Sequence, residues 1–267
     1  MIRVGVTVPS FVTDIEIPLA VAARAEGAGL DAVFAYDHLF RRGRDGERRP
    51  AIECFALLGA LAQQTSTIVI GSLVARATLR PPAVLAQQFA SLVRMTGGRV
   101  VAAIGAGDQE SRDENVEYGI GFGTLEQRVA ALVASVAACR DVPDLPIWVG
   151  GTHPAVRAVV GDGVAWNCWD GDPRRFAADA ATVRAQAPGA ELTWGGLVVV
   201  DRDDDAARAK AERLGASSAT IVGSPQTVAR AVRPYCAAGA STIVFGPVDS
   251  RDPANCELLA DVRAALN

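Results

Sequence analysis

Two titratable side chains directly follow predicted strands and could exchange a proton with a substrate. His38 comes after the apolar stretch 32–36 and is one of 2 histidines in the chain. An imidazole titrates near neutral pH, so it can donate a proton or stabilise negative charge on a reacting oxygen. A loop histidine bonded to Asp37 or to the backbone would leave the same pattern. The sequence therefore makes His38 a catalytic candidate with a structural alternative.

Asp108 is the second candidate and follows Gly107, after the apolar stretch 100–104. Its carboxylate could act as a general acid or base if it reached within roughly 2.6–3.2 Å of the atom that exchanges the proton. The alternative is a helix cap, because aspartate readily accepts hydrogen bonds from the free N–H groups that begin a helix. Both interpretations fit the sequence.

A Gly150-Gly151-Thr152 stretch follows a further apolar run and precedes His153-Pro154. Two glycines allow backbone N–H groups to approach an anion closely, and a helix that begins here directs its positive end to the same place. A phosphate group suits such a site. Many Gly-Gly pairs are simple turns, so the pair acquires meaning only from its place in the fold.

Strand and helix patterns alternate along the whole chain. Apolar runs of this length, separated by amphipathic helices, are typical of a parallel sheet that is buried on both faces. Eight such units predict an α/β fold, a (β/α)₈ TIM barrel, with residues 1–267 as one domain. An open doubly wound sheet would call for a G-x-G-x-x-G turn after the first strand, and that turn is missing here. The predicted strands are 4–8, 32–36, 68–75, 100–104, 146–149, 164–168, 197–200 and 242–245, and the predicted helices include 15–28, 51–64, 173–187, 205–214, 225–238 and 254–266.

Composition excludes several classes of protein. A net charge of −4 without a long basic run argues against binding to nucleic acid, and no apolar run is long enough to cross a membrane. The chain enters a strand at once, without a signal-peptide pattern. Its 5 cysteines are scattered and none has the spacing of metal ligands, so we expect no metal site and free thiols in a reducing cytoplasm.

The order of these motifs resembles the bacterial luciferase-like superfamily of flavin and deazaflavin oxidoreductases, which are TIM barrels. The resemblance implies that Asp37 and His38 line the cofactor ring. It also implies that Gly150, Gly151 and Thr152 hold the cofactor phosphate. A β-bulge with a non-prolyl cis peptide is expected behind the ring, at Ser72–Leu73 or, as we favour, Leu73–Val74. The other implied cofactor contacts are Gly105, Ala106 and Gly107.

The same resemblance predicts hydride transfer between the deazaflavin coenzyme F420 and a small organic substrate. Asp37-His38, the stretch Gly105–Asp108 and the Ala/Val/Arg-rich composition favour the deazaflavin over FMN. Two positions depart from the pattern, because some members have tryptophan at the place of Arg42 and glutamate at the place of Asp108. One alternative is an FMN-dependent monooxygenase that takes reduced flavin from a partner reductase. Another is a non-catalytic cofactor-binding barrel, which also fits the short segment 201–223 where longer relatives insert a lid.

Two helices predict how the chain assembles. The helices 51–64 and 81–95 carry apolar residues over more than one face, and an exposed apolar patch often marks an interface. Relatives in the superfamily commonly pair through these helices, so we expect a homodimer. The apolar residues concerned are Phe55, Leu58, Leu61, Val84, Leu85 and Phe89.

Overall fold

The computed structural model describes residues 1–43, 46–169 and 171–267. Eight parallel strands form a closed ring, because β9 pairs with β11 on one side and with β8 on the other. The predicted TIM barrel is confirmed. Around the ring the strands are β1 (Arg3–Thr7), β2 (Ala32–Ala35), β5 (Val69–Arg76), β6 (Val100–Gly105), β7 (Ile147–Gly150), β8 (Val164–Trp169), β9 (Leu192–Val200) and β11 (Ala240–Pro247).

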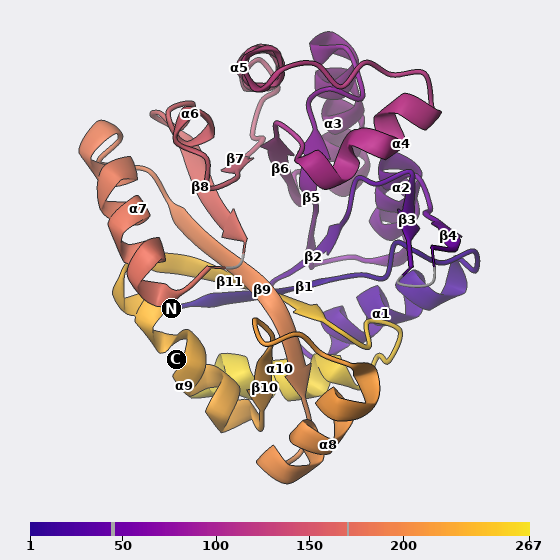
Figure 1. The fold of residues 1–267 in the computed structure, drawn as a ribbon, viewed down its shortest axis with the longest axis vertical. Helices are drawn as coiled ribbons and strands as arrows, with labels where there is room; N and C mark the ends of the chain where they lie inside the picture. Colours follow the sequence, from indigo (N-terminus) through magenta and orange to yellow (C-terminus); the bar gives the residue numbers. More distant parts are fainter. Residues whose placement is uncertain (44–45, 170) are drawn as a thin grey trace.

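Helices surround the strands on the outside of the barrel (Figure 1). Their starts follow the expected capping chemistry: the Thr124 and Gln127 side chains form a complete capping box, and Ser224 accepts from the N–H of Thr227. The two termini lie side by side, joined by a 2.6 Å hydrogen bond from Ile2 N–H to the Asn267 side chain. The long helices are α1 (Glu16–Gly27), α2 (Cys54–Gln64), α3 (Pro82–Thr96), α5 (Leu125–Arg140), α7 (Pro173–Gln186), α8 (Asp204–Leu214), α9 (Pro225–Ala237) and α10 (Asn255–Leu266).

Several short elements lie in segments that the sequence leaves as loops. Within 37–50, β3 (Phe40–Arg42) and β4 (Arg48–Pro50) form an antiparallel hairpin. After β6 come a 3₁₀ turn, η1 (Gln109–Ser111), and the short helix α4 (Arg112–Glu117). The helix expected at His153 is the single turn α6 (Pro154–Arg157). The short strand β10 (Ile221–Gly223) pairs in parallel with the end of β9. β9 also begins earlier than predicted, because residues from Leu192 onward already pair with β8 and β11.

Alternate residues of each strand enter two separate apolar cores. The larger core lies between strands and helices and contains Trp166, which stacks on Phe176 at 5.4 Å. The smaller core fills the barrel interior and contains Phe34 and Trp148. In barrels of this kind the carboxyl ends of the strands carry the functional groups. None of the described helices is both long and apolar enough to span a bilayer.

The apolar surface of α2 and α3 is smaller than the sequence indicates. Leu58, Leu61, Leu85 and Phe89 are fully buried within the single chain, where they pack between the helices and the barrel. Apolar side chains exposed on α3 are Val84 and Met95, at 48% and 45%. The prediction of a large exposed apolar surface fails because α2 and α3 bury apolar residues both against the barrel and against neighbouring helices.

Candidate active site

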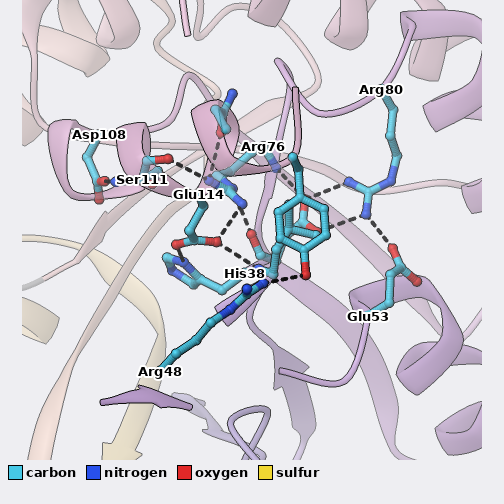
Figure 2. Close-up of polar contacts among 12 residues, drawn as sticks. His38, Arg48, Glu53, Arg76, Arg80, Asp108, Ser111 and Glu114 are labelled. Atoms are coloured by element: carbon cyan, nitrogen blue, oxygen red, sulfur yellow. Dashed lines mark hydrogen bonds and ion pairs between the residues drawn. The ribbon is translucent and has the colours of Figure 1, made fainter. Parts of the chain in front are cut away.

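The loops after β2, β5 and β6 meet at the carboxyl ends of the barrel strands. The first carries Asp37 and His38, the end of β5 carries Arg76, and the segment after β6 carries Glu114 on α4. Figure 2 shows His38, Glu114 and Arg76 linked by hydrogen bonds and ion pairs, and Asp37 joins the same network through Arg76 and Arg80. Functional groups in this class of barrel sit at this end, so the network is the candidate active site.

His38 forms a short hydrogen bond with Glu114, 2.6 Å between Nδ1 and Oε1 (Figure 2). The Glu114 side chain is 6% exposed, while that of His38 is 31% exposed. Oε2 of Glu114 accepts from the N–H of Leu39 at 2.7 Å, so this carboxylate also fixes the loop. On its other side the imidazole lies 5.5 Å from the Phe11 ring. Nε2 has no hydrogen-bond partner among the described residues, which leaves it available to a ligand.

Arg76 compensates the buried charge of Glu114. Its Nη2 lies 2.9 Å from Oε2 of Glu114, its Nε donates to the backbone carbonyl of Asp37 at 2.8 Å, and Nη1 donates to Asn115. Burial raises the pKa of Glu114, whereas the hydrogen bond from His38 and the charge of His38 lower it. With the N–H of Leu39 and the charge of Arg76, these contacts lower the pKa of Glu114 below its usual value.

Asp37, an expected cofactor contact, is occupied by protein groups. Its carboxylate forms a two-pronged ion pair with Arg80, at 2.7 and 2.9 Å, and also accepts from the backbone N–H of Arg76. Arg80 in turn bonds Glu53, the N-cap residue of α2. The Asp37 carboxylate therefore ties β2, β5 and α2 together, and its direct contact with a cofactor stays a prediction.

Asp108 adopts the capping arrangement. Its Oδ1 accepts from the N–H and from the hydroxyl of Ser111, at 2.9 and 2.7 Å, at the start of η1 (Figure 2). The carboxylate that faces His38 is instead Glu114. A proton-transfer role for Asp108 stays a prediction.

The expected bulge lies at the end of β5. The peptide bond Leu73–Val74 is cis, as we favoured, and the pairing of β5 with β6 shifts register between Ser72 and Ala75. Ser72 is buried and donates to the carbonyl of Ala103. A Cβ at Gly105 or Gly150 would lie 2.5 Å from a methyl carbon of Val74. These two glycines therefore make room for the Val74 side chain.

Gly151 and Thr152 occupy different positions relative to a possible anion. The N–H of Gly151 donates to the carbonyl of Asn167 at 3.1 Å, so it is not free for a phosphate. Gly151 has φ +139°, a conformation that favours glycine. The hydroxyl of Thr152 has no partner among the described residues. The phosphate contact of Gly150, Gly151 and Thr152 stays a prediction, and the Thr152 hydroxyl is a group that is free to make it.

Partly exposed apolar side chains line the rest of the barrel mouth. Trp169 packs against the positions of Gly195 and Gly246, and Leu197 is 39% exposed. Val74 and Trp169 are both partly buried and pack on the core inside the barrel. A planar, largely apolar ring fits against these side chains. The lining of the mouth therefore suits a flavin-like cofactor. Gly107, with φ +74°, and the buried Ala106 continue the backbone from β6 on the same rim.

Tyr36 adds a polar group to the mouth. Its hydroxyl donates to Oγ1 of Thr7 at 3.1 Å. Burial raises the pKa of Tyr36, against the opposing effects of the Thr7 hydroxyl and the positive charge of Arg41. The phenol therefore stays protonated near neutral pH.

Sequence reasoning missed Arg76, Arg80 and Glu114. Both arginines follow an apolar strand at the end that carries function, a signal that could have selected them. No comparable signal marks Glu114, which is one of several acidic residues between 108 and 117. Arg42, one of the departures from the family pattern, is exposed and forms an ion pair with Glu117. The described part of the chain contains no cluster of three metal-ligating side chains.

Comparison with known proteins relates the chain to F420-dependent enzymes. An F420-dependent glucose-6-phosphate dehydrogenase of Nakamurella multipartita is 36% identical over 131 residues, which cover 49% of this chain and 36% of that enzyme. A 5,10-methylenetetrahydromethanopterin reductase of Methanolobus tindarius is 25% identical over 78% of this chain and 68% of that protein. The fold matches an F420-dependent secondary alcohol dehydrogenase in complex with an F420-acetone adduct, with a TM-score of 0.78 at 18% identity, over 100% of this chain and 99% of that one.

The family match covers much more of the chain than the match to the dehydrogenase. The segment shared with that enzyme is little more than a third of its length. Residues 3–218, by contrast, match the luciferase-like monooxygenase family. This range includes the strands from β1 to β9 and every candidate site residue. The chain therefore belongs to the luciferase-like monooxygenase family.

Proposed function

We propose that this protein is an F420-dependent oxidoreductase that moves a hydride between the deazaflavin coenzyme and a small organic substrate. The observation that carries the proposal is that Nε2 of His38 has no partner among the described residues and lies at the same carboxyl end of the strands as the apolar side chains of Val74, Trp169 and Leu197. A hydride transfer to or from a hydroxyl-bearing carbon needs one group that exchanges a proton, and His38 supplies it. The names of the matched F420-dependent enzymes support the choice of coenzyme.

Different residues would hold the two ends of the coenzyme. When bound, a deazaflavin accepts or donates the hydride, while the protein supplies orientation and electrostatics. Val74, Trp169 and Leu197 would cover the ring, with the rim Gly105–Gly107 beside it. Thr152 would donate its hydroxyl to the phosphate, next to Gly150 and Gly151.

Chromophore capture tests the proposal. The protein would be expressed in a host that makes both F420 and FMN, and the bound chromophore would be identified by its absorption spectrum. The purified protein would then be assayed with F420 against alcohols, carbonyls and alkenes, with glucose 6-phosphate included. Bound F420 and substrate-dependent loss of its visible absorbance would support the proposal.

Two other outcomes would replace it. Retention of FMN, with oxygen-dependent turnover when a flavin reductase is added, would assign the protein as a monooxygenase. Coenzyme binding without turnover across the substrate panel would assign it as a non-catalytic cofactor-binding barrel.

We also propose that the protein is a cytoplasmic homodimer. Val84 and Met95, exposed on α3, support an interface. The buried free thiols Cys54, Cys139 and Cys256 suit a reducing compartment. Light scattering at micromolar concentration tests the assembly, and the mass of one 27.8 kDa chain would rule out the dimer.

A further inference from the structure

We propose that Glu114 is a positioning residue that holds a proton on Nδ1 of His38 and thereby makes Nε2 the nitrogen that exchanges a proton with substrate. The exchange with substrate rests on the proposed function, whereas the position of the proton on the ring does not. Asp108, the carboxylate that the sequence selects, is occupied as a helix cap.

The contacts of Glu114 determine which partner donates the short hydrogen bond. Oε2 already accepts two donors, the N–H of Leu39 at 2.7 Å and Nη2 of Arg76 at 2.9 Å. A carboxyl group in this setting is ionised, as its lowered pKa also indicates. An ionised carboxylate only accepts hydrogen bonds. The 2.6 Å contact with Oε1 therefore requires that Nδ1 of His38 carries a hydrogen in both charge states of the ring.

The surroundings hold this pair in place. Arg76 anchors the far side of the carboxylate and is itself bonded to the carbonyl of Asp37 and to Asn115. The Phe11 ring lies 5.5 Å from the imidazole and 5.6 Å from the guanidinium of Arg41. Two neighbouring charges are paired elsewhere, since Arg80 bonds Asp37 and Arg42 bonds Glu117. Tyr36, also at the mouth, is half-buried, and its raised pKa keeps the phenol neutral near neutral pH.

This arrangement assigns a chemical role to Nε2. In the oxidation of an alcohol, the hydroxyl proton passes to the lone pair of Nε2. A bound deazaflavin, as in the proposed function, would accept the hydride that the alcohol carbon loses with the electron pair of its C–H bond. The positive charge formed on the ring then lies next to the Glu114 carboxylate. In the reverse direction, Nε2–H returns the proton to the carbonyl oxygen.

Glu114→Gln should invert the arrangement. The N–H of Leu39 and Nη2 of Arg76 both donate to the position of Oε2, so the carbonyl oxygen of the new amide occupies it. The NH₂ group of the amide then faces Nδ1. Nδ1 must then accept, so the neutral ring carries its proton on Nε2 and cannot take one from substrate. The matched control is Glu117→Gln on the same helix, because Glu117 bonds the hairpin residues Arg42 and Arg48 and not His38.

Nitrogen NMR reads the protonation of each imidazole without coenzyme or substrate. The chain has 2 histidines, so His153→Asn assigns the His38 signals, and asparagine can replace His153 as the cap of α6. At a pH where the ring is neutral, we expect the proton on Nδ1 in the unsubstituted protein and in Glu117→Gln. In Glu114→Gln we expect it on Nε2. A proton on Nε2 in the unsubstituted protein, or on Nδ1 in Glu114→Gln, would overturn the proposal.

Activity provides the second measurement. With the substrate found in the panel, Glu114→Gln should lower kcat for alcohol oxidation by about 10²–10⁴-fold, with coenzyme affinity unchanged. Glu117→Gln should stay close to the unsubstituted enzyme. Equal activity of the two variants would overturn the role of Glu114. If no substrate turns over at all, the proposed function fails, and the NMR result alone decides the position of the proton.

Discussion

The carboxylate of Asp37 and the guanidinium of Arg80 form a buried two-pronged ion pair, with N–O distances of 2.7 and 2.9 Å. Asp37 is 1% exposed at its side chain and Arg80 is 11% exposed. Their pairing connects the loop that carries His38 to the segment after β5 and, through Glu53, to the start of α2. Asp37 therefore holds the loop that carries His38 in place through its ion pair with Arg80.

Asp37→Asn tests this role. The change removes the charge that compensates Arg80, and breaking a buried pair from one side costs about 3–5 kcal/mol of unfolding free energy. Urea unfolding measures the loss. The control is Asp205→Asn, which breaks an exposed pair with Arg208 and should cost no more than about 1 kcal/mol. Unchanged stability together with weaker coenzyme binding would instead make Asp37 a direct cofactor ligand.

The barrel and the bulge were predictable for different reasons. Strand β6 is buried along its whole length. Such strands appear in the sequence as continuous apolar runs because both faces of the sheet are covered. The Leu73–Val74 bond followed from the family resemblance, since nothing local distinguishes it. The hairpin β3–β4 escaped prediction because it lacks apolar alternation. It is stabilised by Arg48, which lies 4.3 Å from the Phe40 ring and bonds the distant Tyr118.

The central pair of the site could not be read from the sequence. Glu114 is 76 positions from His38 and belongs to a helix of six residues in a polar segment. Only the closure of the barrel brings the two side chains together. Likewise, the sequence does not show that Gly105 and Gly150 make room for the Val74 side chain. Their contact with a cofactor stays a prediction.

Gly150→Ala tests the contact with Val74. The new Cβ would lie 2.5 Å from Cγ1 of Val74, a stiff β-branched side chain, so we expect a loss of about 1–3 kcal/mol. Adding Val74→Ala should recover part of it, because the two changes are coupled through one contact. The control is Gly59→Ala in α2, where a Cβ meets nothing within 4 Å. Additive losses in the double variant would contradict the steric explanation.

Thr152→Val tests the phosphate contact. The change keeps the shape of the side chain but removes a hydroxyl. Hydrogen bonds to charged groups contribute about 1.5–3 kcal/mol, which corresponds to roughly a 10- to 150-fold weaker affinity for F420. Thr182→Val on α7 is the control, because that hydroxyl bonds its own helix at Ala178. Substitution of Gly151 is a poorer test, since φ +139° would strain any side chain there.

His38→Ala tests proton exchange. We expect turnover to fall by about 10²–10⁴-fold, with a much smaller change in coenzyme affinity. Fluorescence titration of F420 and steady-state kinetics separate the two effects. The control is His153→Ala, which removes the other imidazole and the cap of α6 and should have a much smaller effect on turnover. Loss of coenzyme binding in His38→Ala would identify His38 as a binding residue instead.

Glu26 should make the stability of the barrel depend on pH below about 4.5. Burial raises the pKa of its carboxyl, but hydrogen bonds from the N–H groups of Ile68, Thr67 and Ser66 and from the Thr67 hydroxyl lower it to about 2. The group has a lower pKa in the folded state than in the unfolded chain, so its stabilising effect is complete above the unfolded value of 4.5.

That effect should disappear as the pH falls from 4.5 toward 2. Glu26→Gln removes the titrating group, so the difference in unfolding free energy between the two proteins should shrink over this range. Urea unfolding at a series of pH values measures it. Glu212→Gln, at an exposed position of α8, provides the control and should run parallel to the unsubstituted protein. A constant difference between Glu26→Gln and the unsubstituted protein across this range would show that the contacts of Glu26 do not favour its charged form.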